Sequence, residues 1–228
     1  MTREPGDLPA RRCVRTAGRG EPVARDARRL RAPSPASKPC QAERRARAWR
    51  FDRSMAELPA ATLVLGGARS GKSRHAEALV ESQPGDCVYL ATAEAWDAEM
   101  VERISRHQAQ RGSRWRTVEA PLELVDMLGQ VAGPGRAVQV DCLTLWLSNL
   151  MHADRDIAAE TERLVRWLAA PSGPVVLVSN EVGLGIVPDN ALARAFRDHA
   201  GRLHQAVAAV VPAVVFVAAG LPLTLKSA

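Results

Sequence analysis

The fold of this chain is decided by one octapeptide, Gly66-Gly67-Ala68-Arg69-Ser70-Gly71-Lys72-Ser73. It fits the pattern G-x-x-x-x-G-K-[ST], whose glycines let the backbone curl until its N–H groups point at phosphate oxygens. The apolar run 61–65 before it predicts a buried strand, and residues 74–81 after it carry apolar side chains at helical spacing. This order predicts a nucleotide-phosphate site in which Lys72 reaches the β- and γ-phosphates and Ser73 holds Mg²⁺. The motif does not specify the reaction.

Apolar strand patterns alternate with helical patterns along the rest of the chain. Strands are expected at 87–91, 115–118, 138–140, 174–179 and 213–217, and helices at 95–110, 122–128, 143–151, 157–168 and from about Asn190 towards Pro212. Because apolar strands separated by helices form parallel sheets that are covered on both faces, we predict an α/β fold. It is a P-loop NTPase-like fold of three layers, with a mostly parallel sheet between helices.

Ligands of such sheets bind at the carboxyl ends of the strands. Those ends carry Gly66, Thr92, Asp141 and the pair Asn180-Glu181. Asp141 follows an apolar strand directly, which is where the second element of a P-loop site holds Mg²⁺ through water. The alternative role for this carboxylate is to cap the next helix.

Residues 1–54 are a different kind of sequence from residues 55–228. The first segment carries a net charge of +9 and has no sustained apolar period, whereas the second carries −3. We therefore expect 1–54 to be a disordered, basic, Arg/Pro-rich leader and 55–228 to be the folded domain. A transit peptide or a nucleic-acid arm is an alternative role for the leader. The composition favours a segment that the domain does not need, including the possibility that the native chain starts at Met55.

Cysteine usage and hydropathy favour a cytoplasmic protein. The four cysteines form no C-x-x-C pair, which indicates neither a zinc site nor a disulfide framework, so Cys87 and Cys142 are predicted to be buried apolar residues. The run 206–223 has no charged residue, but Pro212 divides it into a helical half and a β-branched half. A helix that leads into a core strand explains this run, and no membrane span is expected.

One stripe of the expected helix 95–110 carries Arg103, His107 and, just beyond it, Arg111, at spacing i, i+4, i+8. Two neighbouring cations disfavour the imidazolium, which keeps the ring neutral and nucleophilic near pH 7. The same arginines can bind the phosphates of a nucleotide. From spacing alone, a solvated basic helix face with an incidental histidine is the alternative.

Several longer runs then occur in one order and spacing: Tyr89-Leu90-Ala91-Thr92-Ala93, Arg103-Ile104-x-x-His107-x-x-x-Arg111, Trp115-Arg116-Thr117-x-Glu119, Ser179-Asn180-Glu181-Val182-Gly183, Gly185-Ile186-Val187-Pro188 and Phe196-Arg197-Asp198-x-Ala200-Gly201. Together with the octapeptide they resemble the bifunctional adenosylcobinamide kinase/adenosylcobinamide-phosphate guanylyltransferase family of bacterial cobalamin biosynthesis. The resemblance covers about residues 60–226.

The resemblance implies two reactions. ATP or GTP phosphorylates the aminopropanol hydroxyl of adenosylcobinamide, and GTP then transfers GMP through an enzyme histidine to adenosylcobinamide phosphate. The matching histidine is His107. The resemblance also implies that residues beyond the octapeptide line the guanine nucleotide site, namely Ala91, Thr92, Ala93, Gln108, Ala109, Gln110, Arg111, Glu119 and Asp141. Mg²⁺, held by Ser73 and Asp141, and a homotrimer complete what the family implies.

Two other classes of function stay open on the residues alone. One is a P-loop kinase of another small molecule, in which His107 binds phosphate without a covalent intermediate. The other is a nucleic-acid-binding ATPase that uses the basic leader. The resemblance favours neither, and we expect no nucleic-acid partner.

Overall fold

The centre of the molecule is a sheet whose middle strands are buried on both faces. The computed structural model describes residues 58–93 and 112–227, which belong to the unit Asp52–Ala228. The strands are β1 (Ala61–Gly66), β2 (Asp86–Ala91), β3 (Trp115–Glu119), β4 (Arg136–Asp141), β5 (Val175–Asn180), β6 (Ala213–Ala218) and β7 (Leu221–Lys226). The helices are α2 (Lys72–Glu81), α4 (Leu124–Val131), α5 (Leu143–His152), α6 (Ile157–Leu168) and α7 (Ala191–Val210).

Within the described ranges the strand order is β3-β2-β4-β5-β1-β6-β7. All pairings are parallel except that of β6 with β7, which is antiparallel. β1 and β5 are almost continuously apolar and buried, as parallel strands covered on both faces must be. The carboxyl ends of the parallel strands therefore meet along one edge of the sheet, and β1 delivers the octapeptide to that edge.

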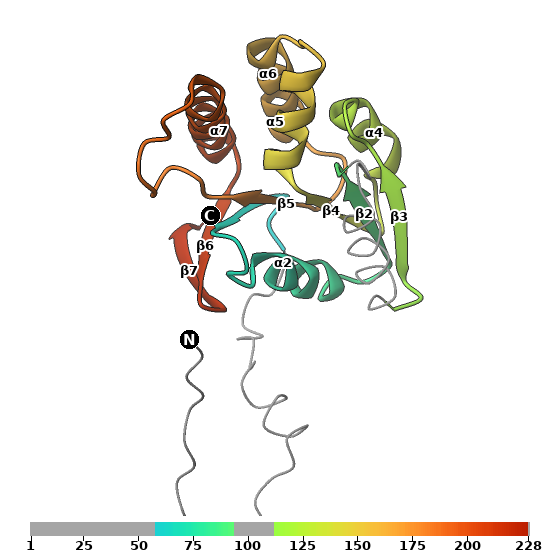
Figure 1. The fold of residues 1–228 in the computed structure, drawn as a ribbon. Coiled ribbons are helices and arrows are strands. Elements are labelled where there is room, and N and C mark those ends of the chain that lie inside the picture. The colour runs from blue at the N-terminus through green and yellow to red at the C-terminus, as the bar shows by residue number, and fades with distance from the viewer. Residues whose placement is uncertain (1–57, 94–111, 228) are drawn as a thin grey trace, which may run out of the picture. The chain divides into compact units, whose positions relative to one another are not determined.

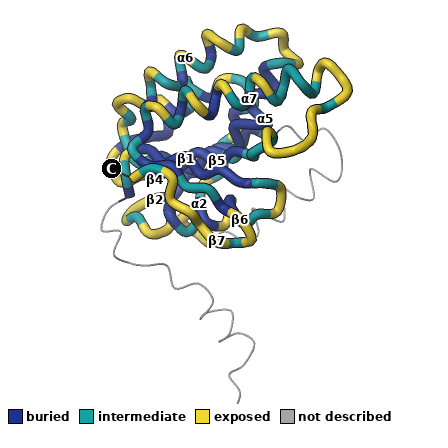
Figure 2. Tube along the Cα trace, turned by 90° about the vertical axis from the view of Figure 1, so that its left-hand side faces the viewer, coloured by how far each residue is buried: buried dark blue, intermediate teal, exposed yellow. Residues whose placement is uncertain are grey.

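Helices cover both faces of the sheet, as the α/β prediction required. Figure 1 shows α2 on one face and α4, α5, α6 and α7 on the other. The main hydrophobic core lies between the sheet and the larger helical layer, where Trp146, Leu164 and Leu203 are buried. In the tube of Figure 2, burial is concentrated in the central strands, and exposed residues lie on the outer helix turns and loops. The strands that carry the site are therefore anchored in a packed core.

The structure differs from the expected elements in two places. β7 was not predicted; its strand pairs with β6 across a tight turn at Ala219 and Gly220, both of which have positive φ. α4 begins at Leu124 instead of the expected 122, because the Leu122 carbonyl accepts hydrogen bonds from Leu124 N–H and Trp146 Nε1–H. The expected helix 95–110 lies outside the described residues.

The uncharged run near the carboxyl terminus divides as expected. α7 ends at Val210, and β6 begins at Ala213 after Pro212. Among the described helices, none has the length and apolar character needed to cross a bilayer. Cys87 and Cys142 are buried free thiols, as predicted.

Candidate active site at the carboxyl ends of the strands

The octapeptide forms a tight loop between β1 and α2, and two of its glycines are required by the geometry. A Cβ on Gly66 would lie 2.5 Å from the Val217 carbonyl oxygen, which no side chain tolerates. Gly71 has φ of 95°, a left-handed conformation that favours glycine, and it is the residue that caps α2. No side chain caps this helix, so the N–H groups of its first turn are available to an anion.

Lys72 is the cation of this loop. Its side chain is mostly buried, with 8% of the residue exposed, and Nζ donates a hydrogen bond to the Gly67 carbonyl at 3.2 Å. The ammonium therefore lies over the loop itself, close to where bound phosphates would be. Ser73, half-buried, is the next residue in the first turn of α2. Lys72 and Ser73 thus both lie in the first turn of α2.

Three of the expected nucleotide-binding residues lie side by side at the ends of β3, β2 and β4. In the sheet register Ala91 pairs with Glu119 on one side and with Asp141 on the other. Glu119 is exposed and Asp141 is half-buried. The N-cap of α5 is Cys142, one residue after Asp141.

Thr92, expected as a nucleotide contact, is fully buried and its hydroxyl is engaged by the chain. Its Oγ1 donates to the Cys142 carbonyl and accepts from the Cys142 N–H, both at 2.8 Å. Asn149 of α5 donates from Nδ2 to the Thr92 carbonyl at 2.8 Å and to the Pro121 carbonyl at 3.0 Å. Thr92 thus fastens the end of β2 to the end of β4, and Asn149 ties α5 to the segments that follow β2 and β3.

Two of these fastening residues could not be recognised as site residues in the sequence. Asn149 and Thr144 lie within the helix pattern 143–151 and resemble ordinary polar positions there. In the structure Thr144 Oγ1 accepts from Asn180 Nδ2 at 3.0 Å, which ties α5 to the end of β5. The sequence signal was a polar residue on an otherwise buried helix face, and only the fold shows what it touches.

The end of β5 is held by a buried polar cluster. Ser179 Oγ and His204 Nε2 are 2.6 Å apart, and His204 Nδ1 lies 3.9 Å from Glu181 Oε2. Burial lowers the pKa of His204 below its usual value, and the nearby Glu181 carboxylate opposes this shift only in part. His204 is therefore neutral at pH 7. The Glu181 N–H donates to the Gly66 carbonyl at 3.0 Å, which joins this cluster to the phosphate loop.

The donor set at the loop fits Mg²⁺. Ser73 and Asp141 would supply a hydroxyl and a carboxylate oxygen, the hard ligands that Mg²⁺ prefers, and this ion keeps several waters and phosphate oxygens in its shell. Within the described residues no three His, Cys, Asp or Glu side chains form a metal cluster. A P-loop site does not require such a cluster, because the nucleotide supplies ligands of its own.

The remaining expected residues, His107, Gln108, Ala109, Gln110 and Arg111, lie outside the described residues. Along one edge of the sheet the structure places the loop Gly66–Ser73 after β1 and the strand ends at Ala91–Ala93, Asp141 and Glu119, with Glu119 four strands from β1.

A parallel sheet with this loop between β1 and α2, and a carboxylate at the end of β4, defines a nucleotide-binding protein of the P-loop class. The sequence model of the family described as cobinamide kinase/cobinamide phosphate guanyltransferase matches residues 62–225, and the chain belongs to this family.

Curated relatives agree with this assignment. The chain is 49% identical over 166 residues to the bifunctional adenosylcobalamin biosynthesis protein CobP of Pseudomonas aeruginosa, covering 72% of this chain and 96% of the relative. It is 40% identical over 179 residues to the proteins named CobU of Salmonella typhimurium and of Escherichia coli, covering 72% of this chain and 98% of each relative. The resemblance to the bifunctional family is thereby confirmed.

Proposed function

We propose that this protein is a bifunctional enzyme of adenosylcobalamin biosynthesis that works as a cobinamide kinase and a cobinamide-phosphate guanylyltransferase. The observation that carries the proposal is a complete phosphate loop, with Lys72 over it, in a chain 49% identical to a bifunctional relative. In the first reaction the hydroxyl of adenosylcobinamide attacks the γ-phosphorus of ATP or GTP, giving adenosylcobinamide phosphate and the nucleoside diphosphate.

In the second reaction His107 attacks the α-phosphorus of GTP, forming a histidine–GMP adduct and releasing pyrophosphate. The phosphate of adenosylcobinamide phosphate then displaces the histidine and gives adenosylcobinamide-GDP. A covalent intermediate divides one displacement between two polyanions into two steps. GTP is positioned in the first step and adenosylcobinamide phosphate in the second. A neutral imidazole is required as the nucleophile, and the expected positions of Arg103 and Arg111 favour it.

The chain's own groups divide the work along the sheet edge. Lys72 and the N–H groups at the start of α2 hold the β- and γ-phosphates, and Ser73 and Asp141 would hold Mg²⁺, which neutralises the phosphate charge when bound. Glu119 lies four strands from β1, about 19 Å at 4.8 Å a strand. We assign its carboxylate to the guanine base or the ribose, because it can accept from guanine N1–H and N2–H₂ or from ribose hydroxyls.

Four further points belong to the proposal. Residues 55–228 carry both activities, and the basic leader 1–54 is dispensable for them, because all the family runs lie after Met55. The enzyme is a homotrimer, as the family resemblance implies. It acts in the cytoplasm, as the cysteine usage of the chain favours. Nucleic acid is not a partner.

The test is a product assay with the purified full chain. Adenosylcobinamide with γ-labelled ATP should give labelled adenosylcobinamide phosphate, and later addition of GTP should convert this product to adenosylcobinamide-GDP. A chain that forms the phosphate but never the GDP conjugate would be a kinase only. Failure to form either product would reject the proposal.

A further inference from the structure

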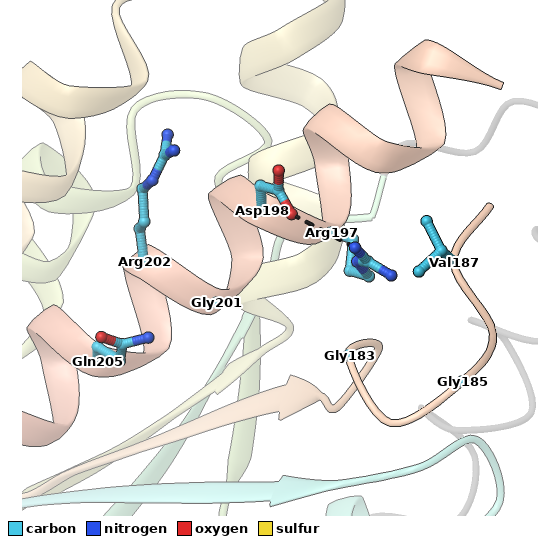
Figure 3. A pocket seen from close by; sticks show the side chains of 8 residues that line it. All are labelled: Gly183, Gly185, Val187, Arg197, Asp198, Gly201, Arg202 and Gln205. Atoms are coloured by element: carbon cyan, nitrogen blue, oxygen red, sulfur yellow. Dashed lines mark ion pairs between the residues drawn. The ribbon is translucent and has the colours of Figure 1, made fainter. Parts of the chain in front are cut away.

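A groove beside α7 has no part in the nucleotide functions described above. It lies between the loop 183–187 and residues 197–205 of α7, and its volume is about 480 Å³. This volume is within the range of roughly 300–1,000 Å³ typical of small-molecule sites. Two family-like runs, Gly185–Pro188 and Phe196–Gly201, contribute its two walls (Figure 3). No residue of the phosphate loop lines it. We call it the α7 groove.

Hydrogen bonds of Glu181 connect one wall of the α7 groove to the phosphate loop. The Glu181 N–H bonds the Gly66 carbonyl at 3.0 Å, and Glu181 Oε1 accepts from the Gly183 N–H. Gly183 is two residues beyond Glu181, so the near end of the groove lies within about 10 Å of Gly66, the length of two extended residues and a hydrogen bond. The near end of the groove therefore lies close to the start of the phosphate loop.

The lining of the groove combines hydrogen-bonding groups with an apolar rim. Arg197 and Asp198 are paired at 3.8 Å and present donors and acceptors together, and Figure 3 shows Arg197 directed across the groove toward Val187. Arg202 and Gln205, on the next turn of α7, are exposed and form no hydrogen bond or ion pair with the described part of the chain.

On the opposite wall, Val187 supplies an apolar side chain beside Gly183 and Gly185. Val187, which lines the groove, is 61% exposed, and the neighbouring Ile186, which does not line it, is 97% exposed. The ligand that suits this lining is broad and apolar on its face and carries primary amides at its edge. A corrin ring has this chemistry: its face is apolar, and each amide at its edge offers a carbonyl acceptor and an NH₂ donor.

We propose that the α7 groove binds the corrinoid acceptor, adenosylcobinamide and its phosphate. Arg202 and Gln205 pair with the amides of the ring, and Val187 packs against its face. The inference rests on the proposed function, since it names the site at which that function takes its second substrate. A nucleotide suits the groove less well, because the loop Gly66–Ser73 already supplies the phosphate contacts.

Gly201 allows a direct test. It lies in the middle of the groove wall formed by α7, and a Cβ added to it meets nothing within 4 Å. Gly201→Phe would place an aromatic ring in the groove from a Cβ that meets no atom within 4 Å, and glycine is the poorest helix former after proline, so α7 should not be weakened. Gly129 in α4 is the matched control, since it is a helical glycine with open space around it and lies away from the groove.

The measurement is equilibrium dialysis of adenosylcobinamide, followed by corrin absorbance, together with kinase kinetics. For Gly201→Phe we expect the affinity for adenosylcobinamide to fall at least tenfold. A fall of this size corresponds to the loss of about one or two hydrogen bonds. The KM for ATP should stay within about twofold, as expected for a site that nucleotide does not use. Gly129→Phe should behave as the wild type in both assays.

A second variant, Arg202→Ala with Gln205→Ala, removes polar groups instead of filling space. It should raise the KM for adenosylcobinamide roughly tenfold. Arg166→Ala, an exposed arginine on α6, is its control. If Gly201→Phe binds adenosylcobinamide like the wild type, the groove proposal fails while the kinase function stands.

Two other results would also overturn the inference. If the wild type neither binds nor phosphorylates adenosylcobinamide, the proposed function fails first and the groove proposal with it. If Gly201→Phe changes the sedimentation coefficient and leaves the affinity for adenosylcobinamide unchanged, the groove is a contact between copies of this chain.

Discussion

The phosphate loop and the α7 groove lie at the same edge of the sheet, but they are built in opposite ways. The loop is eight consecutive residues whose backbone does the binding, and its shape is enforced by buried neighbours such as Val217. The groove joins two segments that are separate in sequence and presents exposed side chains. The loop should therefore tolerate no change in shape, whereas the groove should tolerate substitution and alter only the choice and affinity of the acceptor.

The largest expected effect is that of Lys72→Ala. Because one phosphate loop serves both reactions, removal of its cation should lower kinase and guanylyl transfer alike, by roughly 10²–10³ in kcat, the usual cost of losing one preorganised charge-stabilising group. Rates of both product-forming steps would be compared with those of Arg166→Ala, which removes a surface cation. Loss of kinase activity with guanylylation at the wild-type level would reveal a second nucleotide site.

A matched pair of glycines tests whether the backbone of the loop is as constrained as its contacts indicate. Gly66→Ala places a methyl group 2.5 Å from a backbone oxygen, and should reduce the free energy of unfolding by roughly 1–3 kcal/mol. Gly67→Ala meets nothing within 4 Å and should change it by less than about 0.5 kcal/mol. Urea unfolding of both variants measures this. Equal effects would show that the loop is free to adjust its shape.

A smaller effect is expected at the end of β4. Asp141→Asn keeps the shape of the side chain but removes its charge, so the Mg²⁺ concentration for half-maximal kinase activity should rise by roughly tenfold, about 1.4 kcal/mol of lost metal binding. A Mg²⁺ titration of the rate at saturating ATP provides the measurement. An unchanged midpoint would remove Asp141 from the metal site and leave it a role in the sheet edge only.

The contrast between loop and groove also explains which features the sequence could predict. The loop, the strand β1 and the helix α2 are contiguous, and a motif of fixed spacing with apolar flanks defines all three. The alternation of apolar strands and helices predicted the parallel sheet. The expected ends of its strands predicted where Asp141 and Glu181 lie. The last helix was expected to start at about Asn190, and in the structure Asn190 caps α7 with its Oδ1, which accepts from the Ala193 N–H.

The groove and the fastening contacts could not be predicted, because they depend on pairs of distant residues. Nothing near Asn149 in the sequence shows that its amide reaches Thr92 and Pro121. His204 likewise fits an ordinary helix position until β5 brings Ser179 to 2.6 Å from its ring. β7 was missed because all but its last residue are exposed, so its alternating leucines have no buried side to mark it as a strand.

The measurement that tests the central claim most directly is labelling with α-labelled GTP. The wild type should form a protein adduct that is labile in acid and stable in base, and peptide mapping should place it on His107. His107→Ala should accept no label and make no adenosylcobinamide-GDP, yet keep substantial kinase activity, because phosphoryl transfer to a hydroxyl needs no covalent residue. Alanine is the best helix former, so the substitution itself should not disturb the expected helix. Label on His107→Ala, or loss of both activities in a variant that remains folded, would contradict the account.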